Sequence, residues 1–198
     1  SHRGSKDKKM IRFDMPEAHL RMNLLKGSIH HKVDIHLKRN KAKGIAVDGV
    51  PIKKTADLLG ICNVVFFSPE DLNIIKNGPS ERRHFLDAEL CQLDKIYLYD
   101  LSNYNKILNQ RNKLLKDMVY RPELSDTLPV WDMQLADTGK KIIRRREKFV
   151  KELNEIVHEI HYRISGGREE LFLSYEPSVS ADLLEQELER VKPRDLKQ

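Results

Sequence analysis

Cysteine is scarce in this chain of 198 residues, which contains only Cys62 and Cys91. Two cysteines without a C-x-x-C pair cannot build a disulfide framework. Long hydrophobic runs are also missing, since no stretch approaches the ~20 apolar residues that cross a bilayer. The opening residues lack a hydrophobic segment, so we expect no secretory signal, and the absence of an initiator methionine suggests a piece of a longer protein. We expect a protein of the reducing cytosol, without a disulfide scaffold or membrane span.

Charge is unevenly distributed along the chain. It has 36 Lys and Arg against 30 Asp and Glu, for a net charge of +6. Residues 1–54 hold 14 basic and 5 acidic residues, or +9, whereas residues 55–198 hold 22 and 25, or −3. A basic first quarter suits an acidic partner such as a phosphate backbone. On composition alone, a solvated lysine-rich β-surface is the favoured interpretation.

The first third has the pattern of β-structure. Runs 18–25 and 31–39 flank a turn-like segment, and the second run alternates Val33, Ile35 and Leu37 with polar residues. The pattern predicts an antiparallel meander. Its further expected elements are a strand at 44–47 closed by Asp48-Gly49, a helical turn or two at 55–59, and a short strand buried on both faces at 64–67.

From residue 68 the pattern becomes helical. Ser68 is a good N-cap, and Pro69 followed by two acids is typical of a helix start. Asn77-Gly78-Pro79 is expected to end that helix, and helical spacing then continues to about residue 118. Its apolar stripe comprises Leu93, Tyr97, Leu101, Tyr104, Leu108, Arg111 and Leu115, flanked by Ile96, Ile107 and Leu114.

A loop at 121–129 and a second long helix at 130–165 complete a predicted antiparallel helical hairpin. The apolar stripe of the second helix comprises Ile142, Phe149, Leu153, Ile156, Ile160 and Ile164. Arg146 falls on that stripe, so we expect it to snorkel or to pair with an acid across the hairpin. Gly166-Gly167 ends the helix, and a short strand at 171–175 and an acidic helix at 181–191 follow.

Catalytic motifs are largely missing. Gly44 and Gly49 have the spacing of a P-loop, but Val50 and Pro51 replace its Lys and its hydroxyl residue. No G-x-G-x-x-G and no Walker B strand is present. We therefore expect no catalytic residue in this chain.

Metal ligands are also sparse. His158 and His161 stand three apart on a helix beside Glu155 and Glu159, a spacing that can hold a metal. A helix surface is the favoured interpretation, and we expect no metal site. Surface or packing positions likewise explain His30, His31 and Cys91.

A basic cluster lies on the second long helix. Its members are Lys140, Lys141, Arg144, Arg145, Arg146, Lys148 and Lys151, which with Glu147 carry +6. The cluster suits phosphate contacts, and a solvated helix face is an equally good interpretation.

Residues 69–87, PEDLNIIKNGPSERRHFLD, carry a more specific pattern. They resemble the signature of the bacterial RecF proteins, recombination mediators with an SMC-like ABC ATPase head. The one departure is Asn77, where the family has Gly, and Asn tolerates positive φ well enough for the turn to survive. Further matches are YDLSNYNKIL at 99–108, QRN at 110–112, VDG at 47–49 and SHR at 1–3.

The resemblance implies an α+β fold from the middle of RecF. It implies part of the first ATPase lobe, with antiparallel strands, at residues 1–68. A helical lid with a hairpin arm is implied at 69–167, and a short strand and acidic helix returning toward the head at 168–198. A Walker A loop, an ABC signature and a Walker B strand are absent, so we expect no ATP hydrolysis and no cofactor in this chain alone.

The same resemblance implies roles for individual residues. Arg3 matches the arginine loop that approaches nucleotide phosphates. Ser68, Glu70 and Asp71 match the position of the Q-loop, although the usual Gln is absent, and Glu70 serves equally well as an acid at a helix start.

Arg82 and Arg83 begin a helix, where the helix dipole disfavours cations, so we expect them to have a partner. Glu81 or Asp87 is one candidate, and a DNA phosphate or an opposing head is the other. The DNA- or partner-binding candidates are therefore Arg82, Arg83, Lys140, Lys141, Arg144, Arg145, Lys148 and Lys151.

For the intact protein, the resemblance implies ATP and Mg²⁺ binding, ATP-dependent homodimerisation, and DNA binding at single-strand/double-strand junctions. It implies loading of RecA with RecO and RecR in gap repair, fork maintenance and SOS induction, in the cytoplasm at the nucleoid. The alternative is a freestanding helical-hairpin interaction module without nucleotide chemistry.

Overall fold

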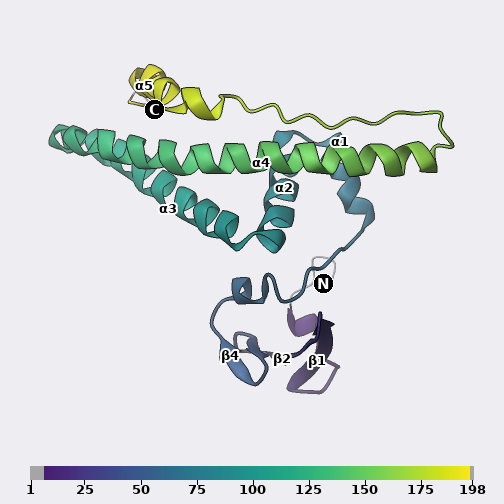
Figure 1. Ribbon diagram of the computed structural model, residues 1–198. Helices are drawn as coiled ribbons and strands as arrows, with labels where there is room; N and C mark the ends of the chain where they lie inside the picture. The colour runs from purple at the N-terminus through teal and green to yellow at the C-terminus, as the bar shows by residue number, and fades with distance from the viewer. Residues whose placement is uncertain (1–6, 197–198) are drawn as a thin grey trace. The chain divides into compact units, whose positions relative to one another are not determined.

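The computed structural model describes residues 7–196, and contacts divide the chain after Leu93 into two compact units (Figure 1). A four-stranded antiparallel sheet is followed by helices, which confirms the expected α+β class. Among the described residues, no helix combines the length and the apolar character that a membrane crossing needs.

The sheet of the first unit is a meander. Its strands pair antiparallel in chain order: β1 (Glu17–Lys26), β2 (Ile29–Lys38), β3 (Gly44–Val47) and β4 (Val50–Ile52). The alternation predicted for β2 is confirmed, because Val33 and Leu37 are each only 3% exposed. Asp48 and Gly49 both have positive φ, 52° and 84°, the geometry that two-residue hairpin loops favour.

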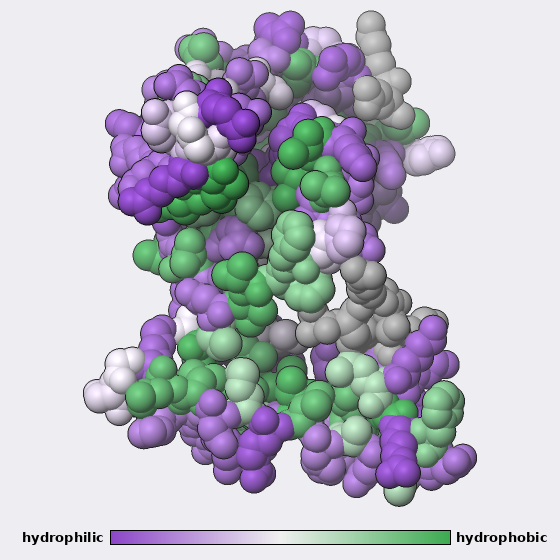
Figure 2. All heavy atoms as spheres, turned by 90° about the vertical axis from the view of Figure 1, so that its right-hand side faces the viewer, coloured by the Kyte–Doolittle hydropathy of each residue, from purple (hydrophilic) through white to green (hydrophobic). Residues whose placement is uncertain are grey.

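The apolar run at 64–67 is not the buried strand that its composition predicts. It has no regular secondary structure, and the exposure of Val65 and Phe67 reaches 95% and 79%. Hydrophobic residues are visible at the molecular surface in Figure 2. An apolar run becomes a strand only where a neighbour supplies backbone hydrogen bonds, and no described strand pairs with this one. The Val64 N–H instead donates to Gln92 Oε1 at 2.7 Å.

Short helices complete the first unit. They are the 3₁₀ turns η1 (Asp7–Met10), η2 (Thr55–Leu58) and η3 (Pro69–Leu72) and the helices α1 (Asn73–Lys76) and α2 (Pro79–Leu93). The predicted start at Ser68 is confirmed, because its N–H donates to Asp71 Oδ2 at 2.5 Å. Asn77 has φ −94°, so this position does not need the positive φ that we attributed to it.

The second unit contains the predicted helical hairpin. Helix α3 (Lys95–Met118) packs on α4 (Leu128–Ile164), and the expected loop between them is largely a 3₁₀ turn, η4 (Pro122–Thr127). The continuous helix predicted up to residue 118 is interrupted at Asp94, which is extended at φ −138°. An Asp side chain competes for backbone N–H groups and therefore favours a helix start over a helix interior.

The core of the second unit lies where the two helices overlap. Tyr97 and Ile107 of α3 are buried, as are Leu135, Ala136 and Ile142 of α4. The turn η5 (Ala181–Leu183) and helix α5 (Leu184–Asp195) pack on α4, and Ala181 is 7% exposed.

The far end of the α4 stripe is not core, contrary to the sequence pattern. Ile156, Ile160 and Ile164 are 57%, 50% and 79% exposed. The reason is length: α4 has 37 residues and α3 has 24, so α3 cannot cover the C-terminal end of α4.

The strand predicted at 171–175 is also absent. These residues have no regular structure and lie along α4, where the Leu173 N–H donates to Asn154 Oδ1 at 2.5 Å. The His158 and Phe172 rings stack there with centroids 4.8 Å apart. The side chains of α4 therefore replace the strand partner that this segment lacks among the described residues.

Candidate nucleic-acid interface

The residues matched to nucleotide contacts are only partly described. Arg3 lies outside the described residues. Ser68 is buried and, with Asp71, forms the reciprocal hydrogen bonds that begin η3. The Asp71 carboxylate is thus engaged in starting this helical turn. Glu70 is exposed beside it.

Arg82 has a partner of a kind that the sequence did not predict. Its Nη1 donates to the carbonyl oxygens of Ile74 and Asn77, at 3.2 and 3.1 Å. These carbonyls lie at the end of α1, where backbone acceptors lack helical partners. Arg82 thus joins α1 to α2, and both Arg82 and the neighbouring Arg83 are exposed.

The basic cluster of α4 divides into two groups by burial. Lys140 and Arg145 are its more buried members, with side chains 24% and 28% exposed. Lys140 Nζ lies 2.6 Å from Glu185 Oε1 of α5, and Arg145 Nε donates to Asp94 Oδ2 at 2.8 Å. These two cations connect α4 to α5 and to the start of α3.

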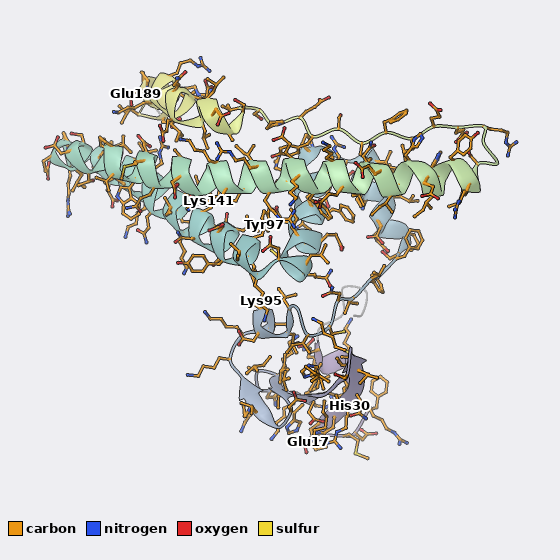
Figure 3. All side chains as sticks on the ribbon, viewed as in Figure 1. Glu17, His30, Lys95, Tyr97, Lys141 and Glu189 are labelled. Atoms are coloured by element: carbon orange, nitrogen blue, oxygen red, sulfur yellow. The ribbon has the colours of Figure 1, made fainter. Side chains whose placement is uncertain are left out.

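The remaining members form an exposed basic face of α4. They are Lys141, Arg144, Lys148 and Lys151, whereas Arg146, the seventh member, is half-buried and donates to the Tyr97 hydroxyl. Their spacing of three, four and three residues places them on one side of the helix, over about 15 Å. Three of them contact an acid of the chain: Lys141 with Asp137 at 2.8 Å, Arg144 with Asp182 at 2.7 Å and Lys148 with Glu152 at 3.8 Å. Figure 3 labels Lys141 on α4.

The ion pairs of this exposed face are weak. The side chains of Lys141, Arg144 and Lys148 are 53%, 63% and 70% exposed. Surface pairs of this kind contribute about 0–1 kcal/mol. The hydrogen bond that Lys141 donates to the Asp137 carboxylate raises the pKa of Lys141, so this side chain remains a cation at neutral pH.

Asp94 uses both carboxylate oxygens. Oδ1 accepts from the N–H groups of Ile96 and Tyr97, at 2.9 and 3.1 Å, and Oδ2 accepts from Arg145. The hydrogen bond from the Arg145 guanidinium, with help from the two N–H groups, holds the pKa of Asp94 below its ordinary 3.8 despite partial burial. One residue therefore begins α3 and ties it to α4.

Replacing Asp94 separates these two roles. Asn retains the cap, so Asp94→Asn should lower the free energy of unfolding by about 1 kcal/mol, and Asp94→Ala, which also loses the cap, by about 2 kcal/mol. A lowered pKa in the folded state stabilises the protein above the unfolded pKa, and this contribution disappears as pH falls through the folded pKa. Both variants should therefore lose less stability than the parent below about pH 4. Urea unfolding followed by the fluorescence of Trp131, the only tryptophan and a residue of α4, measures both effects.

Asp117→Asn is the matched control, because Asp117 is exposed on the same helix. Its effect should stay within about 0.5 kcal/mol. Equal decreases in the free energy of unfolding for Asp94→Asn and Asp94→Ala would contradict separate roles for the two carboxylate oxygens, one in the cap and one in the Arg145 contact.

Arg111 is the most buried cation of the second unit's described residues, at 4% exposure. Its Nε donates to Asp132 Oδ1 at 2.5 Å, and its Nη2 lies 2.9 Å from Asp195 Oδ2 of α5. Burial lowers the pKa of Arg111, but hydrogen bonds to Asp132 and Asp195 outweigh burial and raise it above its ordinary value. Arg111 thus joins three helices.

The remaining residues that the sequence singled out have structural contacts. Arg146 Nε donates to the Tyr97 hydroxyl at 3.0 Å, across the hairpin. His158 Nδ1 lies 3.3 Å from the Leu171 carbonyl oxygen, and His161 Nε2 lies 3.7 Å from Glu169. Both histidines thus contact the segment that follows α4, which favours a surface role over the metal pair.

Three features escaped the sequence analysis. Asp94 as a cap was hidden inside a helical pattern, although an Asp followed by an apolar run is a recognisable signal. Gly139, in the middle of α4, carries no signal in the sequence that distinguishes a packing glycine. A cluster of Glu17, His19 and His36 depends on strand register, which alternation alone does not fix.

No protein-family model matches the chain. It is 60% identical over 197 residues to the DNA replication and repair protein RecF of Agathobacter rectalis, covering 100% of this chain and 54% of the relative. It is 54% identical over 199 residues to the protein of the same name from Lachnospira eligens, covering 100% and 55%. A solved structure of the recombination mediator protein RecF with ATP, in the RecFOR pathway, superposes with a TM-score of 0.82 at 33% identity, covering 100% of this chain and 55% of the other.

The meander followed by a helical hairpin corresponds to a segment of the ABC-type ATPase fold. Both the sequence and the structural similarity extend over the whole chain. The chain belongs to the RecF family, and it spans about half the length of the curated relatives it matches.

Proposed function

We propose that this chain is the lid and lobe-coupling segment of an ATP-dependent DNA-binding recombination mediator. In this proposal, residues 1–68 contribute to the first ATPase lobe, residues 69–167 form the lid with its hairpin arm, and residues 168–198 return toward the head. The observation that carries the proposal is 60% identity to a RecF over the full chain. The intact protein would dimerise on ATP, bind gapped DNA, and load RecA with RecO and RecR at the nucleoid in the cytoplasm. Gap repair, fork maintenance and SOS induction would depend on it.

ATP and Mg²⁺ would be bound by the intact protein. The solved RecF structures with ATP and with ATPrS support nucleotide use. This chain would contribute Arg3 toward the phosphates and the segment around Glu70 toward the coupling of lobes. The P-loop-like spacing of Gly44 and Gly49 is not followed by the lysine that would hold the β- and γ-phosphates.

DNA would contact the exposed basic face of α4. The ion pairs of this face are weak, so a DNA phosphate would be able to replace the carboxylate partners of its cations. Lys140 and Arg145, in contrast, are engaged in helix packing. Arg83 is a second exposed candidate, and Arg82 would act as a positioning residue through α1.

The double variant Lys148→Gln and Lys151→Gln tests this surface. Fluorescence anisotropy of a gapped duplex, titrated with the chain at several salt concentrations, should show weaker binding by about tenfold. The slope of log K against log salt should fall by about 2, because each lost phosphate contact removes about one released counterion.

The matched control is Lys113→Gln with Lys116→Gln, which removes the same charge from exposed positions on α3. This control should retain most of the affinity and of the slope. Equal losses in both variants would show that only net charge matters. No binding by the parent chain would support the alternative, a helical-hairpin interaction module.

A further inference from the structure

Three potential metal ligands meet on one face of the β1–β2 hairpin. Glu17 and His19 are two residues apart on β1, so their side chains emerge on the same face. His36 is the register partner of His19 on β2. The ligand atoms of the three side chains all lie within 4.8 Å of one another.

The separations approach those of a metal centre. His36 Nε2 lies 3.0 Å from Glu17 Oε2, and His19 Nε2 lies 3.6 Å from Glu17 Oε1. A tetrahedral Zn²⁺ with ligand bonds of about 2.0–2.2 Å requires ligand atoms about 3.3–3.6 Å apart. The cluster is therefore within a small side-chain rotation of that geometry.

The strand pairing preorganises the cluster. The His19 and His36 rings stack with centroids 3.9 Å apart and an interplanar angle of 22°. Two imidazoles and one carboxylate form a ligand set that suits zinc and leaves a fourth position for water.

We propose that Glu17, His19 and His36 form a binding site for a divalent zinc-type metal ion that links β1 to β2. The ion would join two strands that only a two-residue loop connects in sequence, and it would stabilise the folded sheet by binding it in preference to the unfolded chain. The site belongs to this chain's own sheet and needs neither nucleotide nor DNA.

Lys38 competes with a metal ion for the Glu17 carboxylate. Its Nζ lies 3.5 Å from Glu17 Oε2, the same oxygen that His36 contacts. A bound cation would have to displace this ammonium group. Removal of Lys38 should therefore strengthen metal binding, the opposite of the effect expected from a loss of structure.

Calorimetric titration of the chain with Zn²⁺, with Co²⁺ absorption as a probe of tetrahedral geometry, tests the proposal. The parent should bind one Zn²⁺, and His19→Gln and His36→Gln should each weaken binding by at least about tenfold. Lys38→Gln should bind several-fold more tightly. Circular dichroism checks that each variant is folded.

Two controls assign the site. His30→Gln removes another exposed histidine of β2, labelled in Figure 3 together with Glu17, and should leave Zn²⁺ affinity unchanged. His158→Gln with His161→Gln removes the α4 histidines and should also leave it unchanged. Absence of binding to the parent at millimolar Zn²⁺, or equal affinity of the parent and the His19 and His36 variants, would overturn the proposal.

Discussion

Replacing Arg111 by methionine is expected to lower the free energy of unfolding of the helical unit by about 3–5 kcal/mol. Arg111 is 4% exposed and contacts acids of two other helices. Removing it leaves Asp132 and Asp195, with side chains 12% and 19% exposed, without their cation. The loss of stability exceeds that from breaking an ordinary ion pair because two partly buried carboxylates are left without a cation. Urea unfolding followed by Trp131 fluorescence measures the effect.

Lys113→Met is the control, since Lys113 is exposed on the same helix, and it should change stability by less than about 0.5 kcal/mol. Replacing Asp132 and Asp195 by asparagine in the Arg111→Met background should recover part of the loss, because the stranded charges are then gone. A single Arg111→Met loss below about 1 kcal/mol would contradict the argument for a buried network.

Replacing Gly139 by valine is expected to destabilise the same unit by about 2–3 kcal/mol. A Cβ at this position would lie 2.7 Å from Leu184 Cδ2 and 3.3 Å from Tyr104 Cε2. Gly139 thus lets α3 and α5 approach α4 closely on both sides. Gly139→Ala should be nearly neutral, because the gain of about 1 kcal/mol in helix propensity offsets a contact that the flexible end of Leu184 can relieve. Unfolding curves at constant pH compare the two variants.

Gly78→Val makes the same chemical change where no atom lies within 4 Å of the Cβ position, and it should cost far less. If valine and alanine at position 139 had equal effects, close packing would not be the reason for glycine there.

The sequence predicted the elements whose patterns are local. The alternation in β2, the Asp48-Gly49 turn and the Ser68 start depend on neighbours a few residues away, and the structure contains all three. The two long helices were predictable for the same reason.

The errors occurred where a distant partner decides the structure. The runs at 64–67 and 171–175 have strand-like composition, but no described strand pairs with either. The C-terminal end of α4 is exposed because α3 is shorter than α4. The apolar pattern of α4 alone contains no information on the length of α3.

The candidate site shows the same limit. The positions of the basic residues on α4 were predicted, and their helical spacing follows directly from the sequence. Their division into packing and exposed groups was not, because the acids that contact Lys140 and Arg145 lie 45 and 51 residues away in the chain. A count of charges cannot distinguish a cation that already has a partner from an exchangeable one.

Asp94 has a further consequence for how the hairpin opens. The first turn of a helix normally frays independently of distant contacts. Here the carboxylate that accepts the N–H groups of Ile96 and Tyr97 also accepts the Arg145 hydrogen bond. Unwinding of the start of α3 and separation of α3 from α4 therefore release the same residue. We therefore expect fraying of the start of α3 and separation of α3 from α4 to be coupled.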